Sequence, residues 1–159
     1  MSDAYHGPDA GVRAWSWLAR GPHRGARSSV MNPTAHRAGR EARISPAPNR
    51  GRFLSEEAAL GEVVRRIVDA FHPQEVRLFG SRLAGNASPD SDFDLVVVLD
   101  EDAPESWLDA DVIYRPLVGS GVGCDVIACR RNEFDAVLRD RANPWGAAWG
   151  KAKALHVRA

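Results

Sequence analysis

The 159-residue chain has no apolar run of about 18 residues, the length that a membrane-spanning helix needs. It contains only two cysteines, Cys124 and Cys129, too few for the disulfide framework of a small secreted protein. Its five histidines are scattered, and no Cys-x-x-Cys or His-Glu-x-x-His motif is present, which disfavours a zinc site. We therefore expect a cytoplasmic protein. Its two thiols should be reduced, because their odd spacing places them on opposite faces of one strand.

The net charge is zero, but the charges are unevenly distributed. Residues 1–52 carry nine Arg and three acidic residues, whereas residues 53–159 carry twelve Lys or Arg and eighteen acidic residues. The first segment is also rich in Gly, Pro and Ser and has no helical or strand periodicity, which indicates disorder. We predict a disordered basic extension over 1–52 and one folded domain over 53–159. The extension is either passive or a basic arm that contacts nucleic acid or an acidic partner.

Periodicity within residues 53–159 predicts both helices and strands. Ser55 is an N-cap candidate, and apolar residues follow it at helical spacing as far as Phe71. Apolar, β-branched runs predict strands at 75–79, 93–99 and 121–129 and an edge strand at 155–157. Further helices are expected at 106–118, at 132–139 with Asn132 as its cap, and from Pro144 onward. In the last helix, Trp145 and Trp149 are expected to pack in the core rather than stack on a base.

Two aspartates stand at the start of the most apolar strand, Phe93 to Leu99. Because side chains alternate along a strand, Asp92 and Asp94 project to the same face, about 7 Å apart. Asp125 lies in another apolar strand and can complete a three-carboxylate cluster if the two strands are neighbours. Hard oxygen ligands on rigid strands favour Mg²⁺ or Mn²⁺.

Structural explanations for these acids remain open at this point. Asp92 could cap the strand, Asp94 could pair with Arg77 or Arg82, and Asp125 could be a buried, hydrogen-bonded acid.

A Gly-Ser pair precedes the aspartates. Gly80 lets the backbone approach a ligand closely, and Ser81 adds a hydroxyl and an amide near a helix start, where anions bind. The dipeptide alone is uninformative. Its position is informative, because it follows an apolar strand and stands ten residues before the Asp-x-Asp sequence that opens a second strand.

This arrangement, Gly80-Ser81, ten residues and then Asp92-Phe93-Asp94, resembles the signature of the DNA polymerase beta-like nucleotidyltransferase superfamily. In its compactness it is similar to the minimal nucleotidyltransferase branch, and the resemblance covers residues 58–157. It implies an α+β nucleotidyltransferase fold, a small mixed β-sheet packed with helices. Gly123 is a departure, since the pattern has a bulkier strand residue there.

The resemblance also implies roles for particular residues. The catalytic residues, which would also hold two Mg²⁺ ions with Mn²⁺ as an alternative, are Asp92, Asp94 and Asp125. The residues that would contact the triphosphate of the incoming nucleotide are Gly80, Ser81 and Arg82. Whether Arg82 binds phosphate or only pairs with an aspartate is left open.

The implied reaction is metal-dependent transfer of a nucleoside monophosphate, AMP from ATP, to a hydroxyl group. The implied acceptor is a partner protein with a HEPN domain, often a ribonuclease toxin, which the chain would silence as an antitoxin. Residues 53–159 leave no room for the acceptor domains of larger relatives. The alternatives are a non-catalytic binding antitoxin or scaffold module and nucleotidylation of a small molecule.

A second aspartate sequence follows the apolar strand. Residues 96–103 resemble the strand and Asp-x-Asp entry of haloacid-dehalogenase phosphotransferases, which would make Asp100 a nucleophile. Pro104 and the restriction of lysine to positions 151 and 153 disfavour this interpretation.

Overall fold

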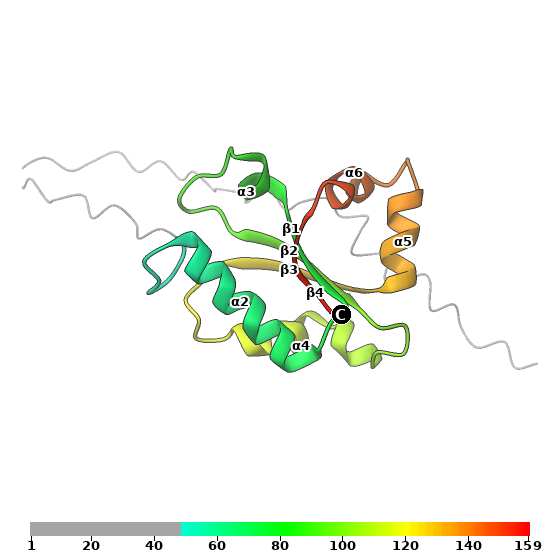
Figure 1. Cartoon of the computed structure of the whole chain (residues 1–159), viewed down its shortest axis with the longest axis horizontal. Helices are drawn as coiled ribbons and strands as arrows, with labels where there is room; N and C mark the ends of the chain where they lie inside the picture. The colour runs from blue at the N-terminus through cyan, green and yellow to red at the C-terminus, as the bar shows by residue number, and fades with distance from the viewer. Residues whose placement is uncertain (1–48) are drawn as a thin grey trace, which may run out of the picture. The chain divides into compact units, whose positions relative to one another are not determined.

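The structure, a computed structural model, describes residues 49–159 (Figure 1). The helices are α2 (Glu56–Phe71), α3 (Gly80–Ala84), α4 (Ala110–Ile113), α5 (Arg131–Arg139) and α6 (Pro144–Gly150), with short 3-10 turns η1 (Glu105–Leu108) and η2 (Arg115–Leu117). The strands are β1 (Glu75–Phe79), β2 (Phe93–Leu99), β3 (Cys124–Arg130) and β4 (Lys153–Val157). Residues 1–48, most of the predicted extension, lie outside the described residues. Among the described residues, no helix is long and apolar enough to cross a membrane.

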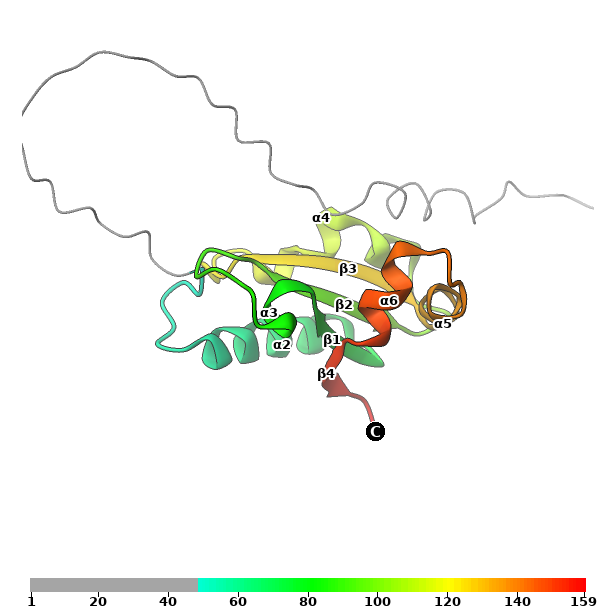
Figure 2. The ribbon, with the colours of Figure 1, turned by 90° about the horizontal axis from the view of Figure 1, so that it is seen from above.

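The four strands form one mixed sheet in the order β3-β2-β1-β4. β1 is antiparallel to both β2 and β4, and β2 is parallel to β3. Helices α2 and α4 lie on one side of this sheet, and α5 and α6 lie on the other (Figures 1 and 2). The predicted α+β fold with a small mixed sheet packed with helices is therefore confirmed.

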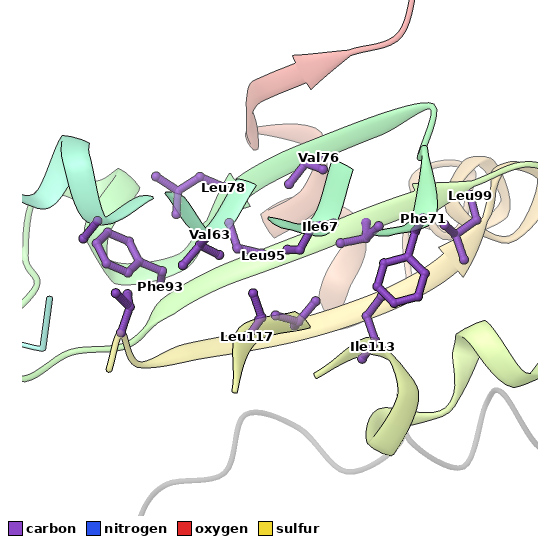
Figure 3. Packing of buried hydrophobic residues seen from close by; sticks show 14 of the residues in the cluster. Val63, Ile67, Phe71, Val76, Leu78, Phe93, Leu95, Leu99, Ile113 and Leu117 are labelled. Atoms are coloured by element: carbon purple, nitrogen blue, oxygen red, sulfur yellow. The ribbon is translucent and has the colours of Figure 1, made fainter. Parts of the chain in front are cut away.

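The central strand β2 is covered on both faces, as its apolar run predicts. Its residues from Leu95 to Leu99 are at most 1% exposed, so neither face is open to water. Figure 3 shows Val63 and Ile67 of α2 packed against Leu95. Burying each such side chain contributes about 1.5–3 kcal/mol. This strand fixes the position of the aspartates at its start.

Helix α2 has the ends that the sequence predicts. The Ser55 hydroxyl accepts a hydrogen bond from the Ala58 amide at 3.1 Å, as an N-cap residue does. At the other end His72 adopts a left-handed conformation, with φ 46°, just before Pro73. The buried face is spaced at helical intervals and comprises Ala59, Val63, Ile67 and Phe71. The helix is core scaffolding.

Helix α6 carries two tryptophans, Trp145 and Trp149, and each contacts a phenylalanine of another element. Asn143 caps the helix by accepting from the Trp145 amide at 3.0 Å. Trp149 is 1% exposed and stacks on Phe134, with ring centroids 5.4 Å apart. Trp145 meets the edge of Phe79 at 5.9 Å. The predicted core packing is confirmed for Trp149, whereas Trp145 is only partly buried.

The single helix predicted over 106–118 is wrong. The structure has three short segments there, η1, α4 and η2. The backbone at Asp109 is extended, with φ −74° and ψ 135°, and this separates η1 from α4. Pro116 in η2 has no backbone amide to donate to a continuous helix. The apolar spacing still places Ile113 and Leu117 in the core. Periodicity therefore predicted the burial of this segment but not its continuity.

Three smaller details also differ from what the sequence predicts. Helix α5 begins at Arg131, so Asn132 lies inside its first turn, and it is the Glu133 carboxylate that accepts from the Arg130 amide, at 2.8 Å. Strand β3 begins at Cys124 rather than residue 121, because Gly121 has φ 71°, outside the strand region. Gly80 and Ser81 open the short helix α3 rather than a simple turn.

Both cysteines are free, as predicted. Burial raises the pKa of the Cys124 thiol to about 12 and raises the pKa of the buried Cys129 thiol as well. Both thiols are therefore protonated at neutral pH and are poor nucleophiles.

Candidate active site

The parallel pairing of β2 with β3 sets Asp94 directly opposite Asp125. On the other side of β2, the register pairs Asp94 with Phe79, the last residue of β1. The three strands therefore bring together the residue before Gly80 and two of the predicted catalytic acids. The two aspartate-bearing strands are neighbours, which was the condition for Asp125 to join the cluster.

The three aspartates differ in their exposure to water. Asp92 and Asp125 are exposed, and Asp94 is half-buried. The alternative of Asp125 as a buried structural acid is therefore wrong. Burial raises the pKa of the Asp94 carboxyl, and the negative charges of Asp125 and Asp92 raise it further, against the lowering effect of a hydrogen bond from the Ser81 backbone. The surroundings of Asp94 thus disfavour its anion unless a cation is present.

Gly80 lies directly over the Asp94 carboxylate. A Cβ atom at position 80 would come within 1.9 Å of Asp94 Oδ2, and the residue has φ 75°, which favours glycine. Any side chain here would therefore strain the backbone and displace the carboxylate. The group that Gly80 approaches closely is Asp94, and the contact of Gly80 with a triphosphate stays a prediction.

The guanidinium of Arg82 is held by neighbouring groups. Its side chain is 5% exposed, its Nε donates to the Ser91 carbonyl at 3.0 Å, and its Nη1 pairs with Glu56 at 2.6 Å. The guanidinium carbon also lies 4.2 Å from the ring centroid of Phe93. Arg82 thus ties the loop before β2 to the start of α2. Its ion-pair partner is Glu56 rather than an aspartate.

The other proposed partner of Asp94 is also engaged elsewhere. Arg77 pairs with Glu75, and its guanidinium lies over the Phe134 ring at 5.5 Å. The structural explanation of Asp94 as an ion-pair partner of Arg77 is therefore not supported.

Two residues near the acids were missed by sequence reasoning. The Asn49 side chain contacts both the Asp92 carboxylate and the Gly123 amide. The Tyr114 hydroxyl accepts from the Val126 amide at 2.8 Å, next to Asp125. Burial raises the pKa of Tyr114, and the charge of Asp125 adds to this effect. Neither residue belongs to a sequence motif. The unusual glycine at position 123 was the one feature of the sequence that could have indicated a contact such as that of Asn49.

The donor set suits a hard divalent cation, but the acids are only partly assembled. Among residues 49–159, no group of three or more His, Cys, Asp or Glu side chains is arranged to hold a metal ion. Asp94 and Asp125 are side by side, whereas Asp92 is bound to Asn49. Their carboxylate oxygens and the raised pKa of Asp94 fit Mg²⁺ or Mn²⁺, because such a cation would relieve the repulsion.

Asp100, the second candidate nucleophile, is engaged at the far end of β2. Its carboxylate binds Arg158, at 2.6 and 2.9 Å, and the Gln74 amide at 2.7 Å. These hydrogen bonds lower the pKa of Asp100 to about 2. Asp100 therefore has a structural role, and the haloacid-dehalogenase interpretation has no support.

The family model described as the nucleotidyltransferase domain matches residues 60–144. The match covers more than half of the chain and includes the Gly-Ser pair and all three aspartates. The chain belongs to this nucleotidyltransferase family. The family supports the polymerase beta-like superfamily, a transferase of the EC 2.7.7 type and a nucleoside triphosphate substrate. No curated protein and no solved structure matches the chain.

Proposed function

We propose that this nucleotidyltransferase domain transfers AMP from ATP to a hydroxyl group of a partner protein, as the antitoxin of a HEPN-domain toxin. The observation that carries the proposal is the placement of Asp94 beside Asp125, beneath Gly80. An enzyme needs this concentration of negative charge, whereas a module that only binds a partner does not. The HEPN partner and the antitoxin role come from the resemblance to minimal nucleotidyltransferases.

Asp92, Asp94 and Asp125 would hold the two divalent cations. When bound, Mg²⁺ or Mn²⁺ supplies charge neutralisation of the triphosphate and of the attacking and leaving oxygens. Gly80 and Ser81 would lie against the phosphates, where backbone amides at the start of α3 favour an anion. Arg82 would support them by holding the adjoining loop, and phosphate would have to compete with Glu56 for its guanidinium.

The reaction needs one proton acceptor. The acceptor hydroxyl oxygen forms a bond to the α-phosphorus, the bond from that phosphorus to the β-phosphate bridging oxygen breaks, and pyrophosphate leaves. The hydroxyl proton would pass to Asp125, which is exposed and lies beside Asp94. The chain's main contribution is positioning, since phosphoryl transfer requires little covalent chemistry from the protein.

The openness of the site supports a macromolecular acceptor. Asp92 and Asp125 are both exposed on the surface of the domain. Two hollows among the described residues, of about 240 and 160 Å³, are lined by other side chains, including Asp100 in the first and Val118 in the second. Carboxylates on an open surface suit a hydroxyl on another protein better than a small molecule, which is usually held in an enclosed pocket.

The mass of the partner tests this proposal. A co-purified HEPN-domain partner should gain about 329 Da per AMP when incubated with the wild-type chain, ATP and Mg²⁺, as nucleotidyl transfer to a hydroxyl requires. Asp94→Asn should bind the partner but give no gain in mass and no protection of a cell that expresses the toxin. Parallel incubations with GTP, CTP and UTP identify the nucleotide. Full protection by Asp94→Asn, with no mass change in either sample, would favour the binding-module alternative.

A further inference from the structure

Asn49 links three parts of the site that are distant in sequence. Its side-chain amide nitrogen donates to the Asp92 carboxylate, and its side-chain oxygen accepts from the Gly123 amide at 2.9 Å. Its own backbone amide donates to the Pro89 carbonyl, also at 2.9 Å. One residue thus joins the loop before β2, the carboxylate at the end of that loop, and the chain that enters β3.

Gly123 provides the space for this contact. A Cβ atom at position 123 would lie 1.8 Å from the Asn49 amide nitrogen and 2.2 Å from Asp92 Oδ1. Its backbone does not have a positive φ, so the glycine is required by space rather than by conformation. The departure from the family pattern at Gly123 and the presence of Asn49 therefore have one explanation.

Asp92 needs such a partner more than Asp94 does. Asp94 is a β2 residue with fixed pairing on both sides, whereas Asp92 precedes the strand, is exposed and follows a loop of turn-forming residues. An exposed carboxylate at the end of a loop samples several rotamers, which weakens a metal site unless a hydrogen bond restricts it. Asn49 supplies that hydrogen bond and leaves the second carboxylate oxygen for a ligand.

We infer that Asn49 is a positioning residue for Asp92, which it orients toward the cation that Asp94 and Asp125 share. This inference rests on the proposed function. It extends the site to a residue outside the family match, which begins at residue 60. The contact stabilises the position of one metal ligand and takes no part in the chemical step.

The affinity for Mn²⁺ alone, measured by titration on the full chain, tests the inference. Asn49→Ala should weaken Mn²⁺ binding by about 10–100-fold, the usual effect of removing a partner of a metal ligand. Gly123→Ala should have a similar effect, because its methyl group displaces the same two side chains. The double variant should be no weaker than the weaker single variant, since both changes break one contact. The matched control is Asn132→Ala, an exposed asparagine in α5, which should bind Mn²⁺ as the wild type does.

A second measurement separates positioning from a loss of folding. At saturating Mn²⁺, the transfer rate of Asn49→Ala should return close to that of the wild type, because the folded enzyme is intact and only its cation is bound more weakly. A rate that stays low at every Mn²⁺ concentration, together with a lowered melting temperature, would assign Asn49 a structural role and overturn the inference.

The remaining outcomes distinguish this inference from the proposed function. Wild-type affinity in Asn49→Ala would overturn the inference alone, and tighter binding would show that Asn49 obstructs Asp92 rather than orients it. Absence of Mn²⁺ binding and of nucleotide transfer in the wild type would overturn both the inference and the proposed function.

Discussion

Strand β2 has an aspartate near each end, Asp94 and Asp100. The two aspartates differ in the charges of the side chains around them. Asp100 follows the last residue of the strand and is bound by Arg158 and Gln74, so its pKa is lowered to about 2. Asp94 is the second residue of the strand and lies beside Asp125, and its pKa is raised by burial and by that neighbour. The fold neutralises the charge of Asp100 with Arg158 and provides no such direct partner for Asp94 among the ion pairs of the described residues, which fits the proposal that a ligand neutralises it.

The difference is not caused by a lack of arginine at the Asp94 end. Arg82 lies close enough to lower the pKa of Asp94 slightly, yet its guanidinium donates to the Ser91 carbonyl and to Glu56. Arg158, in contrast, donates directly to Asp100. Arg82 binds other groups and so keeps the loop in place without neutralising Asp94. On the proposed function, this contrast distinguishes a metal-binding carboxylate from a structural one.

The largest expected effect is on catalysis. Asp94→Asn should lower the rate of nucleotide transfer by about 100-fold or more, because metal binding supplies several kcal/mol of transition-state stabilisation. Asp92→Asn should do the same. Asp100→Asn is the matched control on the same strand and should retain the wild-type rate per folded molecule. Transfer by Asp94→Asn within tenfold of the wild type would refute the two-metal assignment.

The next effect is on stabilisation by the cation. Mg²⁺ at about 100 times its dissociation constant should stabilise the wild-type domain by about 2.7 kcal/mol. Asp100→Asn should show the same rise in melting temperature, whereas Asp94→Asn should show little or none. Calorimetry with and without Mg²⁺ measures this difference. An equal rise in all three proteins would place the cation away from Asp94.

The sequence predicted the elements that one dominant local signal determines. The apolar run from Phe93 to Leu99 predicted a doubly covered strand, and the cap at Ser55 predicted the start of α2; both are confirmed. The Gly-Ser and Asp-x-Asp spacing identified a superfamily that the family match supports. Such features depend on neighbouring residues, whose steric and hydrogen-bonding preferences are visible in the sequence.

The features that sequence reasoning missed depend on contacts between distant segments. Asn49 reaches Asp92 and Gly123 only because the chain preceding α2 returns to the entry of β3, where Arg50 forms an isolated bridge with Val122. Asn49 and Arg50 fall within the segment predicted to be a disordered extension, which stays a prediction for residues 1–48. The engagement of Arg82 by Glu56 was likewise invisible, since the two residues are 26 positions apart.

A smaller effect is expected on the stability of the metal-free domain. Asp94→Asn should leave the melting temperature at pH 7 unchanged or raise it, because the substitution removes a charge that its neighbours repel. Asp100→Asn should lower it, because the charge-assisted bonds to Arg158 are lost. Thermal melts in EDTA compare the two variants. A lowered melting temperature for both would mean that the two ends of β2 are equivalent and would remove the contrast between them.

The smallest expected effect is on the pH dependence of stability. The melting temperatures of Asp94→Asn and Asp100→Asn should each differ from that of the wild type by an amount that changes with pH. The carboxyl of Asp94 has a higher pKa in the folded chain than in the unfolded chain, so folding favours its protonated form. Its charge therefore costs stability above the folded pKa, and this cost is relieved as the pH falls through that value. The advantage of Asp94→Asn over the wild type in EDTA should accordingly shrink as the pH is lowered from 7.

Asp100 should behave in the opposite way and in a different pH range. Its pKa falls from its ordinary value of 3.8 to about 2 on folding, so its contribution to stability is complete above a pH of about 4 and is lost between about 4 and 2. The deficit of Asp100→Asn should thus stay constant from pH 7 to 5. Melts of the wild type and both variants across pH 7 to 2 measure the two curves. An Asp94→Asn advantage that grows on acidification would show that the fold stabilises the Asp94 anion, and would contradict the assignment of this end of β2 to a bound cation.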